Sequence, residues 1–154
     1  MSYTLGLRSR LELRGVHPSL VAVVHRAIAI TSQDFRVLDG LREIEEQQEL
    51  VKRGASKTLR SMHLRQPDGW GHAVDLVPVV NGVLRWEWPL IYPVARAMRV
   101  AAEAGNVPLV WGGCWDMPFL SLHPDGLEAA VRVYCARHPG PDFLDGPHYQ
   151  LGQP

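Results

Sequence analysis

The stretch AVDLVPVV, residues 73–80, is followed at once by Asn81-Gly82, and together they decide the fold of this chain. The β-branched and apolar residues predict a strand buried in a sheet. Asn-Gly is the strongest short-range signal for a tight hairpin, so residues 83–86 are expected to return as the next strand. Asp75 alone breaks the apolar pattern. Burying an unpaired charge is very costly, so this carboxylate requires a partner or a metal ion.

Helical periodicity is found on both sides of this hairpin. Apolar residues recur at helical spacing in four stretches: Pro18 to about Thr31, Arg42 to Arg53, Pro89 to Gly105, and Pro124 to about Arg137. The second of these stretches is expected to place Leu41, Ile44, Gln48 and Val51 on one side. Residues 1–16 are mixed, with leucines spaced to dock on the rest of the chain.

Short strands are expected at residues 34–38, 107–111 and 148–151, and residues 55–72 are expected to form an irregular loop. Trp86, Trp88, Trp111 and Trp115 are expected to lie mostly in the core, with the alternative that one or two of them line a groove for a peptide or sugar. Hairpin-linked strands with helices at both ends predict an α+β fold with a small antiparallel sheet. We expect one domain over residues 1–154.

Composition excludes several classes of protein. With 46% hydrophobic and 21% charged residues, and 16 basic against 16 acidic side chains, the chain is that of a globular protein without a basic field for nucleic acid. No apolar run is long enough for membrane insertion. Cys114 and Cys135 form no disulfide framework and are expected to be reduced and mostly buried. The N-terminus lacks signal-peptide features, so we expect a protein made in the cytoplasm. We also expect a monomer.

Possible metal ligands cluster around the predicted strand and near the C-terminus. They are His63, Asp75 and His148, and a second carboxylate, Asp145, stands three residues before the last histidine. Two imidazoles and one carboxylate leave a coordination position open, which distinguishes a catalytic zinc site from a closed structural one. Asp145 is then a candidate general base.

These residues carry a family resemblance. Ser61-x-His63, Gly71-x-Ala73-x-Asp75 and Asp145-x-Pro147-His148 resemble the signature of the zinc peptidases grouped with VanY-type D-alanyl-D-alanine carboxypeptidases. The chain looks more closely like the L-alanyl-D-glutamate peptidases that bacteriophages use as endolysins. Further similar motifs follow in the same order: Gly15-Val16-His17-Pro18, Asp34-Phe35-Arg36-Val37, Gly40-Leu41-Arg42 and Val110-Trp111-Gly112-Gly113. The resemblance implies the D-Ala-D-Ala carboxypeptidase, or hedgehog-like, zinc peptidase fold.

The resemblance also implies residue roles. It makes His63, Asp75 and His148 the ligands of Zn²⁺, and Asp145 the catalytic base that later returns the proton to the leaving amine. Arg42 matches an arginine upstream of the first ligand and is a candidate partner for the developing oxyanion. A surface ion pair at the start of a helix is its alternative role.

Other residues leave alternatives open. Ser61 either hydrogen-bonds the substrate backbone or shapes the loop. Residues 64–70 lengthen the spacing between His63 and Gly71 relative to the family pattern, which makes His72 a rival ligand. Cys114 stands where relatives often carry Asp, so it is another possible ligand. The segment 115–144 that follows is expected to contain a helix beside the cleft.

The sequence therefore predicts a zinc metallopeptidase that hydrolyses the peptide stem of bacterial peptidoglycan. The expected bond is L-Ala–D-Glu, and the expected role is that of a phage endolysin that reaches the cell wall after release and lyses the host. One alternative is a D-Ala-D-Ala carboxypeptidase or dipeptidase of cell-wall metabolism. The other is a catalytically inactive, zinc-bound binding domain on the same fold.

Overall fold

The fold is built on one antiparallel sheet. The computed structural model describes residues 2–56, 60–140 and 143–153. Its strands are β1 (Phe35–Asp39), β2 (Ala73–Val80), β3 (Val83–Leu84), β4 (Leu109–Trp111) and β5 (His148–Leu151). They lie in the order β1-β2-β5-β4, and β3 pairs with the far end of β2. All these pairings are antiparallel, so the predicted α+β class with a small antiparallel sheet is confirmed.

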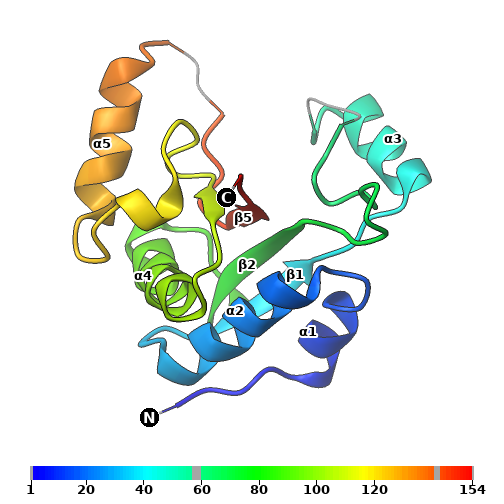
Figure 1. The fold of residues 1–154 in the computed structure, drawn as a ribbon, viewed down its shortest axis with the longest axis horizontal. Helices are drawn as coiled ribbons and strands as arrows, with labels where there is room; N and C mark the ends of the chain where they lie inside the picture. Colours follow the sequence, from blue (N-terminus) through cyan, green and yellow to red (C-terminus); the bar gives the residue numbers. More distant parts are fainter. Residues whose placement is uncertain (1, 57–59, 141–142, 154) are drawn as a thin grey trace.

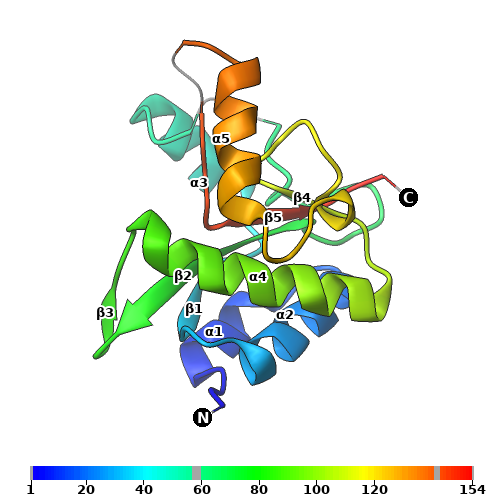
Figure 2. The same cartoon turned by 90° about the vertical axis from the view of Figure 1, so that its left-hand side faces the viewer.

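Helices surround the sheet on several sides. They are α1 (Leu7–Glu12), α2 (Pro18–Ile30), α3 (Ile44–Lys52), α4 (Trp88–Gly105) and α5 (Leu127–Arg137), with a short 3-10 turn, η1 (Phe119–Ser121). Figures 1 and 2 show α1, α2 and α4 together beneath the sheet, while α3 and α5 stand apart from each other on either side of β5. None of the helices in the described ranges has the length and apolar character needed to cross a bilayer.

The core lies between the sheet and the pair α2 and α4. Leu20 and Val24 of α2, Leu76 of β2 and Met98 of α4 are almost completely buried there. His17 begins α2 by accepting a hydrogen bond at Nδ1 from the Ser19 amide, as a helix-capping residue does. The apolar residues whose spacing predicted these elements are therefore the residues that the core buries.

Helix α1 was not predicted. Its six residues are too few to display a clear helical period. A tertiary contact holds it: the hydroxyl of buried Ser9 accepts a hydrogen bond from the Val37 amide of β1 at 3.0 Å. The segment packs on the rest of the chain, as expected. The sequence predicts contacts through leucines alone, whereas a polar hydrogen bond also holds the segment.

The predicted apolar side of α3 was wrong. Ile44 is 44% exposed, Gln48 is exposed, and the one buried side chain of α3 is Gln47. The physical reason is that α3 stands away from the core (Figure 1), so a hydrogen-bonded amide decides its orientation. Burial was also wrong for other residues: Cys135 and Trp86 are exposed, whereas Cys114 and Trp111 are buried as expected.

Strand register brings distant carboxylates and imidazoles together. In the β2–β5 pair, Asp75 stands directly opposite His148, and in the β1–β2 pair it stands opposite Asp39. The β1–β2 register shifts between Val37 and Asp39. Successive residues of a strand face opposite sides, so Asp75 faces away from its buried neighbours Val74 and Leu76. The strand that decides the fold therefore also carries the central residue of the site.

Candidate active site

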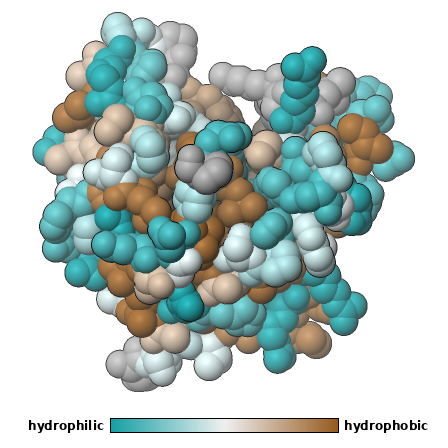
Figure 3. Space-filling view, viewed as in Figure 1, coloured by the Kyte–Doolittle hydropathy of each residue, from teal (hydrophilic) through white to brown (hydrophobic). Residues whose placement is uncertain are grey.

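A cleft of about 1040 Å³ opens on the face of the sheet that carries Asp75 and His148. The space-filling view shows the surface hollowed between the part formed by α5 and the part formed by α3 (Figure 3). The predicted residues Arg42, Ser61, His63, Asp75, Asp145 and His148 all line it. The structure thus gathers in one cavity six side chains that the sequence spreads over more than a hundred residues.

Three of these side chains converge as metal ligands would. The Asp75 Oδ1 atom lies 3.2 Å from His63 Nε2 and 3.1 Å from His148 Nδ1. In the described part of the chain, this is the one group of three or more potential ligands whose donor atoms all lie within 4.8 Å of one another. Bonds of about 2.0–2.1 Å in tetrahedral zinc sites place neighbouring ligand atoms about 3.3 Å apart. The observed separations fit such a site.

Hydrogen bonds on the far side of each imidazole set which nitrogen faces the cluster. The His63 Nδ1–H donates to the carbonyl of Gly40 at 2.8 Å, since a carbonyl can only accept. The His148 Nε2–H donates in the same way to Gln150 Oε1 at 2.8 Å. In the neutral rings, both remaining nitrogens then point lone pairs at the Asp75 carboxylate. A cation between these nitrogens and the carboxylate satisfies this arrangement, which supports a metal site, and without a cation a protonated ring donates to Asp75 instead.

The electrostatics of Asp75 agree with this. Burial would raise the pKa of its carboxyl group, but hydrogen bonds and positive charge from His148 and His63 outweigh burial and hold the pKa well below its ordinary value. The guanidinium of Arg42 adds a further positive charge, with Nη2 3.9 Å from Asp75 Oδ2. Asp75 is therefore ionised at neutral pH, as a metal ligand must be.

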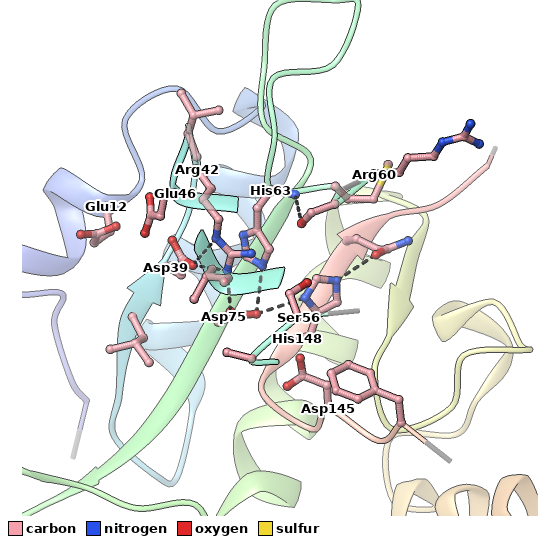
Figure 4. Close-up of a pocket in the computed structure, with 18 of the residues that line it drawn as sticks. Glu12, Asp39, Arg42, Glu46, Ser56, Arg60, His63, Asp75, Asp145 and His148 are labelled. Atoms are coloured by element: carbon pink, nitrogen blue, oxygen red, sulfur yellow. Dashed lines mark hydrogen bonds and ion pairs between the residues drawn. The ribbon is translucent and has the colours of Figure 1, made fainter. Parts of the chain in front are cut away.

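Asp145 lies on the other side of the cluster from Arg42 (Figure 4). Burial and the negative charge of Asp75 raise the pKa of the Asp145 carboxyl group to about 6. A carboxylate with a pKa near the working pH is a stronger proton acceptor than an ordinary one and is still mostly ionised at neutral pH. This environment suits a general base.

The Trp-Gly-Gly motif holds the turn that carries Asp145 and His148. The amide of Asp145 donates to the carbonyl of Gly112, and the amide of Gly112 donates to the carbonyl of His148, both at 2.9 Å. The indole N–H of Trp111 donates to the carbonyl of Gly146 at 2.7 Å. A Cβ atom at Gly112 would lie 2.0 Å from the Asp145 carbonyl oxygen, so only glycine allows this approach.

Arg42 is held in place by three groups. Its Nε and Nη2 donate to Asp39 Oδ2, and its Nη1 donates to Gln47 Oε1 at 2.6 Å. Gln47 in turn donates to the hydroxyl of Ser56 at 2.9 Å. The Arg42 amide also donates to the His63 carbonyl. Arg42 is 9% exposed, so its alternative role as a surface ion pair does not describe its environment.

The rival ligands lie outside the cluster. His72 follows Gly71 on the opposite face of the strand from Asp75, and its Nε2 pairs with Asp68 Oδ2 at 2.7 Å. Cys114 is buried beside Asp116 and Arg137, at 3.6 and 3.7 Å from its sulfur. The hydroxyl of Ser61 accepts a hydrogen bond from the His63 amide and also lines the cleft, which is compatible with both of its predicted roles.

Sequence reasoning missed several residues of the site. Gln150 and Gln47 carry no motif, although the spacing His148-x-Gln150 on a predicted strand could have shown that both side chains share a face. Phe143, near the end of the predicted insertion, also lines the cleft, whereas Trp86 and Trp115 line it in agreement with the expectation for one or two of the tryptophans. The helix expected within residues 115–144 is present as α5, within the described part of that segment.

An open three-ligand cluster with an adjacent carboxylate is the arrangement of a metal-dependent hydrolase. Comparison with known families is consistent with this class, because residues 1–124 match the family described as phage L-alanyl-D-glutamate peptidase. The chain belongs to this family. The matched residues include Arg42, His63 and Asp75 and end before Asp145 and His148.

Two individual relatives extend the comparison. The chain is 27% identical over 120 residues to the L-alanyl-D-glutamate peptidase of Escherichia phage T5, which covers 75% of this chain and 84% of that protein. The crystal structure of the Serratia marcescens L-Ala D-Glu endopeptidase ChiX is similar with a TM-score of 0.70 and 36% identity, covering 95% of this chain and 87% of that one. These likenesses confirm the predicted family and its fold.

Proposed function

We propose that this chain is a zinc peptidase that hydrolyses the L-Ala–D-Glu bond in the peptide stem of peptidoglycan and acts as a phage endolysin in host cell lysis. The observation that supports it most directly is the His63–Asp75–His148 cluster beside the buried carboxylate of Asp145. Family membership and the names of both relatives point to the same bond.

The donor set fits zinc, and each residue has a definable task. Zinc held by His63, Asp75 and His148 would acidify water and polarise the scissile carbonyl group. Asp145 accepts the proton of the attacking water, for which its raised pKa prepares it, and delivers that proton to the leaving amine. Asp145 therefore acts first as base and then as acid.

Arg42 and Ser61 act on the substrate in this proposal. The guanidinium of Arg42 is fixed by Asp39 and Gln47, so its charge is available without reorganisation when negative charge develops on the carbonyl oxygen. Ser61 turns the loop so that His63 faces Asp75, and it lies close enough to the cleft to bind the peptide backbone.

The candidate site is contained within one chain. All six site residues come from one chain, and β1 to β5 join residues 35 to 151 in one sheet. We therefore propose one catalytic domain over residues 1–154 that works as a monomer on the stem peptide.

Single substitutions distinguish the proposed base from the proposed metal ligands. Asp145→Ala is expected to keep bound zinc and to abolish lysis of purified cell walls, whereas His63→Ala is expected to lose both. His72→Ala serves as the matched control and is expected to keep zinc, because His72 lies outside the cluster. Unchanged lysis by the Asp145 variant would disprove the assigned mechanism.

Product analysis identifies the bond. Mass spectrometry of digested muropeptides should show free amino termini on D-Glu and intact D-Ala termini. Release of terminal D-Ala would instead identify a carboxypeptidase, and absence of any cleavage by zinc-loaded protein would favour an inactive binding domain.

A further inference from the structure

The cleft has an aromatic wall that the proposed chemistry does not use. Trp86, Trp115 and Phe143 line it, and of these Trp86 is 56% and Phe143 46% exposed. Exposed apolar side chains that gather in one cleft are typical of a binding site. Trp70, the other strongly exposed aromatic side chain in the described ranges, does not line the cleft.

Trp115 is fixed next to the metal ligands. Its ring lies 5.2 Å from the His148 ring, centroid to centroid, at an angle of 40°. Its indole N–H donates to the carbonyl of Phe143 at 2.6 Å, so the polar atom of the ring is already used. What the side chain offers to a ligand is therefore carbon surface.

The segment that carries Trp115 is also anchored. The next residue, Asp116, binds Arg137 of α5 through both carboxylate oxygens, at 2.8 and 2.6 Å, and accepts a hydrogen bond from His138 at 2.9 Å. These contacts tie the segment that carries Trp115 to the end of α5. A binding surface that is already ordered loses less entropy when a ligand arrives.

Charged side chains lie on both sides of the metal cluster. Glu12, Asp39 and Glu46 gather near Arg42 on one side, Asp145 and Arg60 lie on the other (Figure 4), and the three aromatic side chains themselves are uncharged. The wall therefore suits a neutral part of the substrate with exposed C–H groups. The pyranose ring of a sugar has such a face.

We propose that Trp86, Trp115 and Phe143 form a saccharide subsite for the N-acetylated sugar that carries the stem peptide. This inference rests on the proposed function, because the L-Ala residue of the stem is joined to the lactyl group of that sugar. One residue spans at most about 3.3–3.6 Å, so with the lactyl group the sugar begins roughly 7 Å from the scissile carbonyl. Trp115 offers its ring surface beside the cluster, with its ring centroid 5.2 Å from that of the His148 ring.

The test compares two substrates that share one peptide. The first is a stem peptide with its N-acetylmuramic acid, and the second is the same peptide with an N-terminal lactyl group and no sugar. For the wild-type enzyme, kcat/KM is expected to be roughly tenfold higher for the first substrate, mainly through KM. In Phe143→Ala and Trp86→Ala this ratio should fall towards one, while in the control Trp70→Ala it should stay at the wild-type value.

A binding measurement makes the subsite testable without turnover. Calorimetry on zinc-loaded Asp145→Ala should give tighter binding of the sugar-bearing peptide, and adding Phe143→Ala should remove the difference. Equal affinity for both peptides would overturn the subsite, as would equal kcat/KM in the wild-type enzyme. Tight binding without cleavage of either peptide by the wild-type enzyme would overturn the proposed function and leave the subsite supported.

Discussion

The two sides of the cleft are built in different ways. On one side, β4, β5 and the Asp145–His148 turn are joined by backbone hydrogen bonds through Gly112 and by the buried indole of Trp111. On the other side, α3 buries a single side chain, Gln47, which holds Arg42. Asp145 and the His63–Asp75–His148 cluster are therefore fixed by main-chain and core contacts, whereas Arg42 depends on a few side-chain contacts.

The largest effect is expected from Gly112→Ala. The new methyl group would collide with the Asp145 carbonyl oxygen and force the Asp145–His148 turn away from β2. We expect a loss of about 3 kcal/mol or more in the free energy of unfolding, together with loss of zinc binding and lysis. Thermal and chemical denaturation provide the measurement. Gly6→Ala is the control, since nothing lies near a Cβ atom at that position. Equal stability of the two variants would contradict the tight backbone packing around the Asp145–His148 turn.

The next effect concerns Gln150, which orients His148. Gln150→Leu removes the acceptor for the Nε2–H group, so zinc affinity should fall about 10- to 100-fold. Competition with a chelator measures this change. Gln150→Glu keeps an acceptor and should retain tight binding, and Gln153→Leu is an exposed control on the same segment. A zinc affinity of Gln150→Leu equal to that of wild type would show that His148 does not need this hydrogen bond to stay in place.

The pH dependence of the metal-free protein should reveal the burial of Asp145. Between about pH 4, the ordinary pKa of Asp, and about pH 6, the unfolded chain has ionised this carboxyl group and the folded chain has not. The folded state then binds more protons, so stability falls as pH rises through this window and the loss levels off above it.

The measurement compares wild type with Asp145→Asn by chemical denaturation in the presence of a chelator. The free energy of unfolding of wild type should decrease by about 1–3 kcal/mol relative to the variant between pH 4 and pH 7. Parallel pH profiles would show that Asp145 is not in the buried, negatively charged surroundings described here.

The smallest effect is expected on the α3 side. Gln47→Ala leaves Arg42 attached to Asp39 but removes its contact with α3, so we expect about a tenfold loss in kcat with zinc affinity unchanged. Gln48→Ala, one residue further on and exposed, is the matched control. Equal kcat for both variants would mean that α3 does not position the arginine.

Much of this could be predicted from the sequence because local patterns are strong here. The patterns that predicted β2, α2 and α4 are those of the residues that these elements bury in the core. The Asn81-Gly82 turn was predicted from its own two residues. The prediction failed for α1, which is short, and for the side of α3 that is buried, because a polar contact outweighs apolar spacing there. The residues that the family resemblance singles out lie together in one cleft. Their chemical roles stay predictions.

The amino-acid sequence is enough to identify the side chains of the predicted site: two imidazoles, a carboxylate within an apolar strand, and a second carboxylate before the last histidine. Tertiary structure alone decided that Asp75 and His148, 73 residues apart, stand opposite each other, that Gln150 and Gly40 orient the imidazoles, and that Trp115 and Phe143 face the same cleft. The physical reason is that strand register and packing join distant parts of the chain, and no local pattern records those pairings.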